Sequence, residues 1–143
     1  MSNIAVVYWS GTGNTEAMAN AVADGVNENG GNATLYTADS FNGDMVNDFD
    51  AIAFGCPAMG AEVLEDEEFE PMFNGCESSL NGKKIALFGS YGWGDGEWMR
   101  NWEETCTSDG AVLGVQPDRS GYMSNHLGTV LTDFINTQMI SGY

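Results

Sequence analysis

The chain has 143 residues, a length suited to one domain that buries its own core. It carries 4 Lys and Arg against 21 Asp and Glu, a formal net charge of −17 at pH 7, which repels nucleic acids and anionic membranes. The N-terminus lacks a basic segment followed by a long apolar one, and no apolar run approaches the roughly 20 residues of a membrane span. We therefore expect a single cytoplasmic domain over residues 1–143, a monomer, and a basic protein as its natural partner.

The few cysteines and the single histidine argue against a disulfide scaffold or a metal site. Cys56, Cys76 and Cys106 lie far apart without a Cys-x-x-Cys pair, and His126 is the only histidine. We expect Cys76 and Cys106 to be small, half-buried packing residues. Cys56 precedes Pro57 at the start of the loop after the third predicted strand. A phosphatase loop would place an Arg six residues after its cysteine, but this chain has no Arg there and no adjacent base, so nucleophilic catalysis is not expected.

Apolar runs and helical patterns alternate along the chain. A first strand is predicted at Ile4 to Trp9, followed by an amphipathic helix over residues 16–29 that stops at Gly30 and Gly31. Four more short apolar runs predict strands buried on both faces, at residues 33–37, 51–55, 85–90 and 111–115. Further helices are predicted near residues 45–48, 69–76, 97–107 and 125–140. The alternation indicates a doubly wound parallel α/β sheet with helices on both faces, in which ligands bind beyond the carboxyl ends of the strands.

The loop after the first strand, Ser10 to Thr15, has the shape of a phosphate cradle without a cation. Gly11 and Gly13 let the backbone approach a ligand, and the following helix N-terminus offers N–H groups and partial positive charge. Additional donors are the side chains of Ser10, Thr12, Asn14 and Thr15. Neither a P-loop nor a dinucleotide fingerprint matches this spacing. An ordinary glycine-rich turn, with Asn14 or a neighbour capping the helix, stays open as an alternative.

Two later loops place a thioether and aromatic rings between glycines. Met59 stands beside Gly60 after the third strand, and Tyr91 and Trp93 stand among four glycines in residues 89–96. Taken singly, Met59 or Trp93 fits core packing as well as ligand binding, but Gly-flanked aromatic residues at strand ends are poorly placed for a core. Together with the phosphate loop, they favour an aromatic phosphate ester as ligand.

Three segments, Val7 to Ala19, Gly55 to Pro71 and Gly82 to Met99, resemble the short-chain flavodoxins of anaerobic bacteria. The resemblance implies a five-stranded sheet of order 2-1-3-4-5 with non-covalently bound FMN. It also implies a low-potential one-electron carrier, cycling between semiquinone and hydroquinone, and not an enzyme.

The resemblance assigns roles around the flavin. The phosphate would bind at Ser10 to Thr15, Met59 and Trp93 would cover the two ring faces, and Glu62 would accept a hydrogen bond from flavin N3. The Gly60 carbonyl would turn toward flavin N5, and backbone N–H groups around Gly92 and Trp93 would bind the pyrimidine oxygens. The full set implied is Trp9, Ser10, Gly11, Thr12, Gly13, Asn14, Thr15, Pro57, Ala58, Met59, Gly60, Ala61, Glu62, Ser90, Tyr91, Gly92, Trp93, Gly94 and Asp95.

Two of these positions depart from common family patterns. Pro57 replaces a Ser that reaches the phosphate in some relatives, and Ala61 stands where Asp, Asn or Ser is more familiar. Because only Gly60 adopts a positive φ without strain, we expect a type II′ turn there.

The acidic residues near these loops are expected to lower the reduction potential and to steer a basic redox partner. The candidates are Glu62, Glu65, Asp66, Glu67, Glu68, Glu70, Asp95 and Glu97. A simply solvated surface and helix N-terminus is the alternative.

Two other functions remain open from the sequence. An FMN-dependent NAD(P)H-quinone reductase would need cationic contacts that a chain with only four basic residues hardly offers. A flavodoxin-like binding module without flavin would leave the bracketing aromatic residues unexplained.

Overall fold

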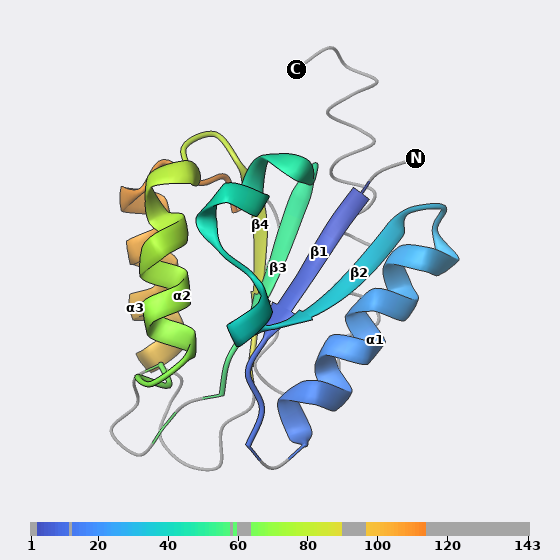
Figure 1. The fold of residues 1–143 in the computed structure, drawn as a ribbon, viewed down its shortest axis with the longest axis horizontal. Coiled ribbons are helices and arrows are strands. Elements are labelled where there is room, and N and C mark those ends of the chain that lie inside the picture. Colours follow the sequence, from blue (N-terminus) through green and yellow to red (C-terminus); the bar gives the residue numbers. More distant parts are fainter. Residues whose placement is uncertain (1–2, 12, 58, 60–63, 90–96, 114–143) are drawn as a thin grey trace.

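The computed structural model of the chain describes residues 3–11, 13–57, 59, 64–89 and 97–113. Within these residues, strands β1 (Asn3–Tyr8), β2 (Asn32–Thr37), β3 (Ala51–Gly55) and β4 (Lys84–Phe88) form a parallel sheet in the order β2-β1-β3-β4. Helix α1 (Asn14–Glu28) lies on one side of the sheet, and α2 (Phe69–Cys76) and α3 (Glu97–Ser108) lie side by side on the other (Figure 1). This arrangement confirms the predicted doubly wound architecture.

The strands are buried on both faces, as their unbroken apolar sequences predict. In β1, Ile4 and Val6 pack in the cluster beneath α1, whereas Ala5 and Val7 pack in the cluster beneath α2 and α3. Phe54 of β3 meets two rings of α2 edge-on, with its ring centroid 5.2 Å from that of Phe73 and 6.5 Å from that of Phe69. These ring contacts hold α2 against the centre of the sheet.

The carboxyl ends of the strands meet at one edge of the sheet. Tyr8 pairs with Thr37 of β2 and with Gly55 of β3, and Gly55 pairs with Phe88 of β4. The chain passes from β1 outward to β2 and then back across to β3, so the strand order reverses beside β1. The loops after β1 and β3 therefore leave the sheet at the place where ligands bind in open α/β folds.

Several element boundaries differ from the predictions. The first strand ends at Tyr8, one residue early, and the fourth begins at Lys84 and ends at Phe88. The segment around residues 45–48 is a 3₁₀ helix, Gly43–Asp48, with Asn42 Oδ1 accepting from the Asp44 N–H at 3.0 Å. A short run rich in Gly, Asn and Asp lacks the length and propensity for an α-helix, and side-chain bonds of this kind compete with one.

The predicted fifth strand is described only at its start. Val112 bridges Lys84 in parallel, the Ile85 N–H donates to its carbonyl at 3.0 Å, and its own N–H donates to the Lys83 carbonyl at 2.8 Å. The segment thus runs beside β4, as an order 2-1-3-4-5 requires. Residues 114–115 and the predicted helix over residues 125–140 lie outside the described residues.

Candidate functional site

The loop after β1 turns directly into α1 through Gly13. Gly13 has φ 96°, in the left-handed region that favours glycine, and its N–H donates to Ser10 Oγ at 3.1 Å. Gly13 is the cap residue of α1, so it offers no side-chain oxygen to the N–H groups of the first helical turn. The described part of this loop therefore does not satisfy the helix N-terminus in the usual way, by a Ser, Thr, Asp or Asn cap.

Trp9 packs over the same loop. A Cβ on Gly11 would lie 3.0 Å from the Trp9 ring, so a side chain there would press on the indole and require it to shift by a few tenths of an ångström. The indole Nε1 donates to Glu68 Oε1 at 3.3 Å, which links the end of β1 to the start of α2. Beside Trp9 and Ser10 lies an open cleft of about 200 Å³, lined by Tyr8, Trp9, Ser10, Glu16, Thr37, Ala38, Asp39 and Glu68.

The Tyr8 phenol lies at the rim of this cleft and donates to Glu16 Oε2 at 3.4 Å. Burial and the Glu16 carboxylate raise the pKa of Tyr8 above its ordinary value. The phenol therefore keeps its proton and stays a hydrogen-bond donor at neutral pH.

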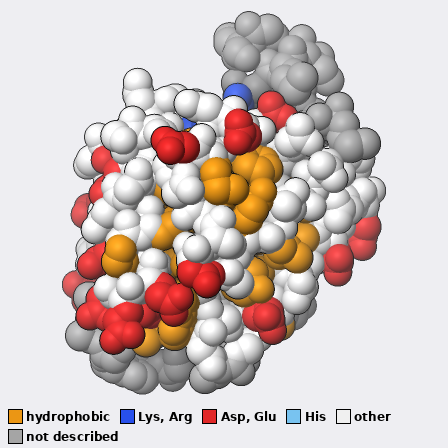
Figure 2. All heavy atoms as spheres, in the orientation of Figure 1, with side chains coloured by type: hydrophobic (Ala, Val, Ile, Leu, Met, Phe, Trp, Pro, Cys, Tyr) orange, Lys and Arg blue, Asp and Glu red, His pale blue; other side chains and the backbone are white. Residues whose placement is uncertain are grey.

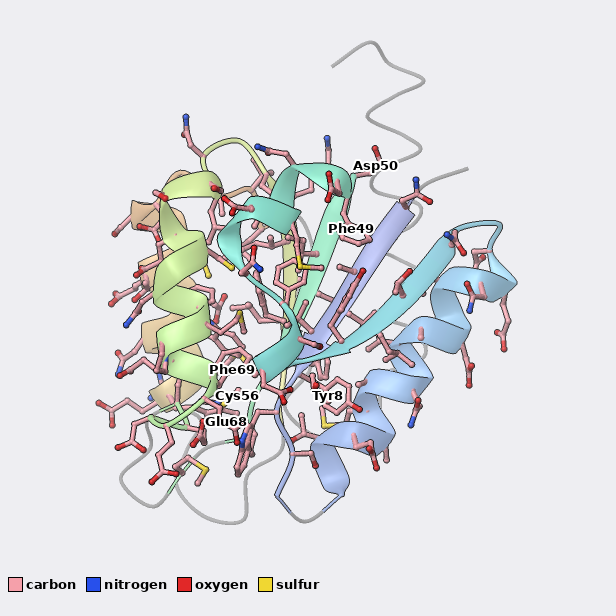
Figure 3. The ribbon with its side chains drawn as sticks, in the orientation of Figure 1. Tyr8, Phe49, Asp50, Cys56, Glu68 and Phe69 are labelled. Carbon is pink, nitrogen blue, oxygen red and sulfur yellow. The ribbon has the colours of Figure 1, made fainter. Side chains whose placement is uncertain are left out.

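The loop after β3 leaves the sheet next to the first loop. Figure 3 shows Tyr8 and Cys56 at one edge of the sheet, opposite Phe49 and Asp50. Pro57 and Met59 follow Cys56 and are half-buried. The fold thus brings together two of the three loops predicted to bind the ligand.

Of the predicted site residues, the structure describes Trp9, Ser10, Gly11, Gly13, Asn14, Thr15, Pro57 and Met59. Thr15 is buried, and Trp9 and Ser10 are half-buried. Thr12, Ala58, Gly60, Ala61, Glu62 and residues 90–95 lie outside the described residues.

Glu65 is a structural carboxylate, a role that its place among the predicted surface acids did not indicate. Its side chain is 5% exposed; Oε1 accepts from the N–H groups of Phe69 at 2.7 Å and Glu68 at 2.8 Å, and Oε2 from that of Glu67 at 2.9 Å. Burial alone would raise the pKa of Glu65, but the three backbone donors outweigh it and hold the pKa below its ordinary value. The alternative expected for the acidic residues, a solvated surface and helix N-terminus, therefore fits Glu65 only in part, because its side chain caps α2 but is buried. The available signal was its place four residues before the helical pattern at Phe69.

The three cysteines are fully buried, deeper than predicted for Cys76 and Cys106. Burial is the main cause that raises the pKa of Cys56 to about 12. The hydrogen bond from the Glu65 N–H lowers this pKa, and the negative charges of Glu65 and Glu70 raise it. Because the thiolate is the reactive form, a thiol with this pKa is not a nucleophile at neutral pH.

The edge of the sheet that carries the loops is acidic. Asp66, Glu67 and Glu68 are exposed at the start of α2, and carboxylates gather at the corresponding end of the face shown in Figure 2. Lys83 and Lys84 lie at the start of β4, at the opposite edge, where Lys83 Nζ donates to the Phe49 carbonyl at 2.8 Å. These two lysines are therefore too far away to neutralise an anion at the first loop.

Comparisons with known proteins identify the family. The family model described as Flavodoxin matches residues 6–122. The chain is 48% identical to a flavodoxin of Clostridium beijerinckii over 112 residues, 78% of this chain and 81% of that protein. It is 48% identical to a flavodoxin of Megasphaera elsdenii over 110 residues, 77% of this chain and 80% of that protein. The chain belongs to the flavodoxin family.

The fold of solved flavodoxins agrees with this assignment. The solution structure of two-electron reduced Megasphaera elsdenii flavodoxin superposes with a TM-score of 0.85 at 41% identity, covering 91% of this chain and 98% of that one. As a flavodoxin, the protein is an electron carrier with a flavin cofactor, not an enzyme with a substrate of its own. The reductase and flavin-free alternatives are not supported. Among the described helices, none is long and apolar enough to cross a bilayer.

Proposed function

We propose that this flavodoxin is a low-potential one-electron carrier whose cofactor is non-covalently bound FMN, and that residues 1–143 form one monomeric FMN-binding domain. The observation that carries the proposal is the first loop: a helix N-terminus without a side-chain cap residue, placed beside Ser10 where the strand order reverses. The 5′-phosphate of FMN is a ligand that such a terminus binds.

The first loop can hold this phosphate without a cation. Ser10 Oγ accepts from the Gly13 N–H, which leaves its own proton to donate to the phosphate. A carboxylate about 10 Å away repels the phosphate by only about 0.4 kcal/mol per unit charge in water, whereas each hydrogen bond to a charged group contributes roughly 1.5–3 kcal/mol. A few donors in direct contact therefore outweigh the surrounding acidic residues.

The remaining residues would bind and orient the ring. FMN supplies reversible one-electron chemistry when bound, and the chain's task is to clamp the ring, exclude water and set the potential. Met59, half-buried after β3, and Trp93 are assigned to the two ring faces, and Glu62 to flavin N3. Carboxylates such as Asp66, Glu67 and Glu68 oppose added negative charge, by roughly 20 mV each at ~10 Å, which favours a low potential.

The test is stepwise reduction of the purified protein with FMN, followed by its visible spectrum. We expect the protein to take up FMN and then electrons in two separate one-electron steps. A protein that takes up no FMN, or that is bleached in one two-electron step by a nicotinamide, contradicts the proposal.

A glycine pair in the chain allows a matched test of the phosphate loop. Gly13 and Gly30 have φ 96° and 86°, and at neither would a Cβ meet an atom within 4 Å. Ala at either position carries the same left-handed strain, about 1–2 kcal/mol. We expect both variants to lose similar stability, but only Gly13→Ala to weaken FMN binding, by about tenfold, in fluorescence titrations. Equal FMN affinities in the two variants would rule out the Gly13 turn as part of the phosphate site.

We also propose that the redox partners dock through basic surfaces. The support is the acidic edge at the loops, from which Lys83 and Lys84 are remote. Complementary charge raises the association rate and makes it sensitive to salt. The second-order rate of electron transfer to a partner should therefore fall severalfold between low and physiological ionic strength, and a rate that is indifferent to salt contradicts basic docking.

A further inference from the structure

We propose that Cys56 is a positioning residue that fixes the bases of both ring-binding loops at a single point. The proposal rests on the proposed function, which places the flavin ring against residues 57–63 and 90–95. In the sequence, the first of these loops starts after Cys56 and ends before Glu65. The second starts after Gly89 and ends before Trp98.

Cys56 uses its thiol to close the first loop. Its Sγ accepts from the Glu65 N–H at 3.4 Å and donates to the Pro57 carbonyl at 3.5 Å. The Cys56 side chain is fully buried. If its sulfur is removed, the Glu65 N–H loses its acceptor at a place that water does not reach. Both ends of residues 57–64 are thereby attached to one side chain.

The backbone of Cys56 makes hydrogen bonds to residues on both sides of the second loop. Its N–H donates to the Phe88 carbonyl at 3.1 Å, and its carbonyl accepts from Trp98 Nε1 at 3.3 Å. A Cβ on Gly89 would collide with this carbonyl oxygen, so the end of β4 approaches it only because residue 89 is glycine. Gly89 and Trp98, the described residues on either side of the second loop, thus both lie against the Cys56 carbonyl.

The contacts of Cys56 with Glu65, Phe88 and Trp98, here called the anchor, affect how the flavin ring would be held. Met59 and Trp93, assigned to opposite ring faces, belong to the two loops whose ends meet at Cys56. The contacts of Cys56 with the described residues that flank both loops are made without ligand, and we infer that they limit the movement of the two loops, which lowers the ordering cost of binding. Trp98 is 2% exposed, so its indole is packed and adds rigidity to the anchor.

Two neutral substitutions test the anchor without changing the charge. Cys56→Ala removes the sulfur acceptor, and Trp98→Phe removes the indole donor while keeping a ring. Each should weaken FMN binding by about fivefold, the value of one neutral hydrogen bond. Each should also shift the potential of the last electron to less negative values, because a looser clamp lets water screen the charge of the reduced cofactor. In the double variant, the combined loss should differ from the product of the single losses by at least about twofold.

Trp102→Phe is the matched control. Trp102 is also 2% exposed on α3, and its Nε1 has no acceptor within the described structure. Removing this N–H should leave FMN affinity within about twofold of the parent and leave the potential unchanged.

The apoprotein gives an independent readout. In Cys56→Ala, hydrogen exchange of the Glu65 amide should accelerate, while the Glu67, Glu68 and Phe69 amides, held by the Glu65 carboxylate, stay protected. Cys56→Ser, which restores an acceptor, should recover part of the FMN affinity that Cys56→Ala loses. If Cys56→Ala and Trp98→Phe both match Trp102→Phe in affinity and potential, Cys56 is not a positioning residue, although the proposed function stands; if Cys56→Ala does not fold, Trp98→Phe decides alone. A parent protein that binds no FMN overturns the proposed function instead.

Discussion

Replacing Glu65 with Ala should lower the free energy of unfolding by about 3 kcal/mol. The Glu65 carboxylate accepts three backbone N–H groups at the start of α2, and its side chain is 5% exposed. Each hydrogen bond to a charged group contributes roughly 1.5–3 kcal/mol, and part of this returns when water reaches the freed donors. Urea unfolding of the apoprotein, with the same slope in parent and variant, measures the loss directly.

Glu68→Ala is the control for charge. It removes the same charge three residues away, but the Glu68 side chain is exposed and accepts only one described bond, from Trp9 Nε1. Its cost should stay within about 0.5 kcal/mol. Glu65→Gln should fall between the two, because one amide oxygen can still accept twice while the NH₂ group faces a donor. Equal losses in Glu65→Ala and Glu68→Ala would mean that the buried cap contributes nothing specific.

The cap also predicts a loss of stability in acid. The pKa of Glu65 in the folded protein lies below its ordinary value of 4.5, so its contribution is complete above 4.5 and disappears as the pH falls through the lowered pKa. The difference between the parent and Glu65→Ala should therefore shrink below pH 4.5 in the same urea titrations.

The layout of the fold was predictable because it depends on local patterns. Unbroken apolar runs such as residues 51–55 predict strands covered on both faces, and the alternation with helices predicts a parallel sheet. Glu65 stands four residues before the helical pattern at Phe69, but this signal did not separate it from the several acids around it in the sequence. Whether a carboxylate faces water or a helix N-terminus depends on where the chain turns after β3. Cys56 and Trp98 are 42 residues apart in the sequence, so no local pattern indicates that they are in contact.

Glu77 and Asp109 form a pair of carboxyl groups at the ends of α2 and α3 that lie far from the ligand-binding loops. Glu77 follows α2 and Asp109 follows α3, and Asp109 is close enough to Glu77 to influence its pKa. Burial, the neighbouring Asp109 carboxyl and the charge of Glu70 raise the pKa of Glu77 from 4.5 to about 7. Asp109 Oδ2 is buried and has no partner in the described residues. Two carboxyls in contact are most stable when they share one proton.

The sign of the pH dependence follows from the raised pKa. A group whose pKa is higher in the folded protein stabilises it fully below the unfolded pKa, here 4.5, and loses this contribution as the pH rises through about 7. We therefore expect the protein to be more stable at pH 5.5 than at pH 8. The rise in the pKa of Glu77 corresponds to at most about 3 kcal/mol of unfolding free energy. We expect a difference of about 1–2 kcal/mol between pH 5.5 and pH 8, because Glu77 is only half-buried and solvent screens the pair.

Glu77→Gln should remove most of this dependence, because an amide can donate to the Asp109 carboxylate at every pH. The variant should be more stable than the parent at pH 8 and similar to it at pH 5.5, in thermal or urea unfolding at both values. Glu104→Gln removes one exposed charge from α3 and controls for the general relief of repulsion in a chain of net charge −17. If the stabilities of parent and Glu77→Gln ran parallel between pH 5.5 and 8, the Glu77–Asp109 pair would not share a proton. Because the pair joins the ends of the two helices that cover one face of the sheet, its ionisation should first loosen these ends, which lie away from the flavin loops.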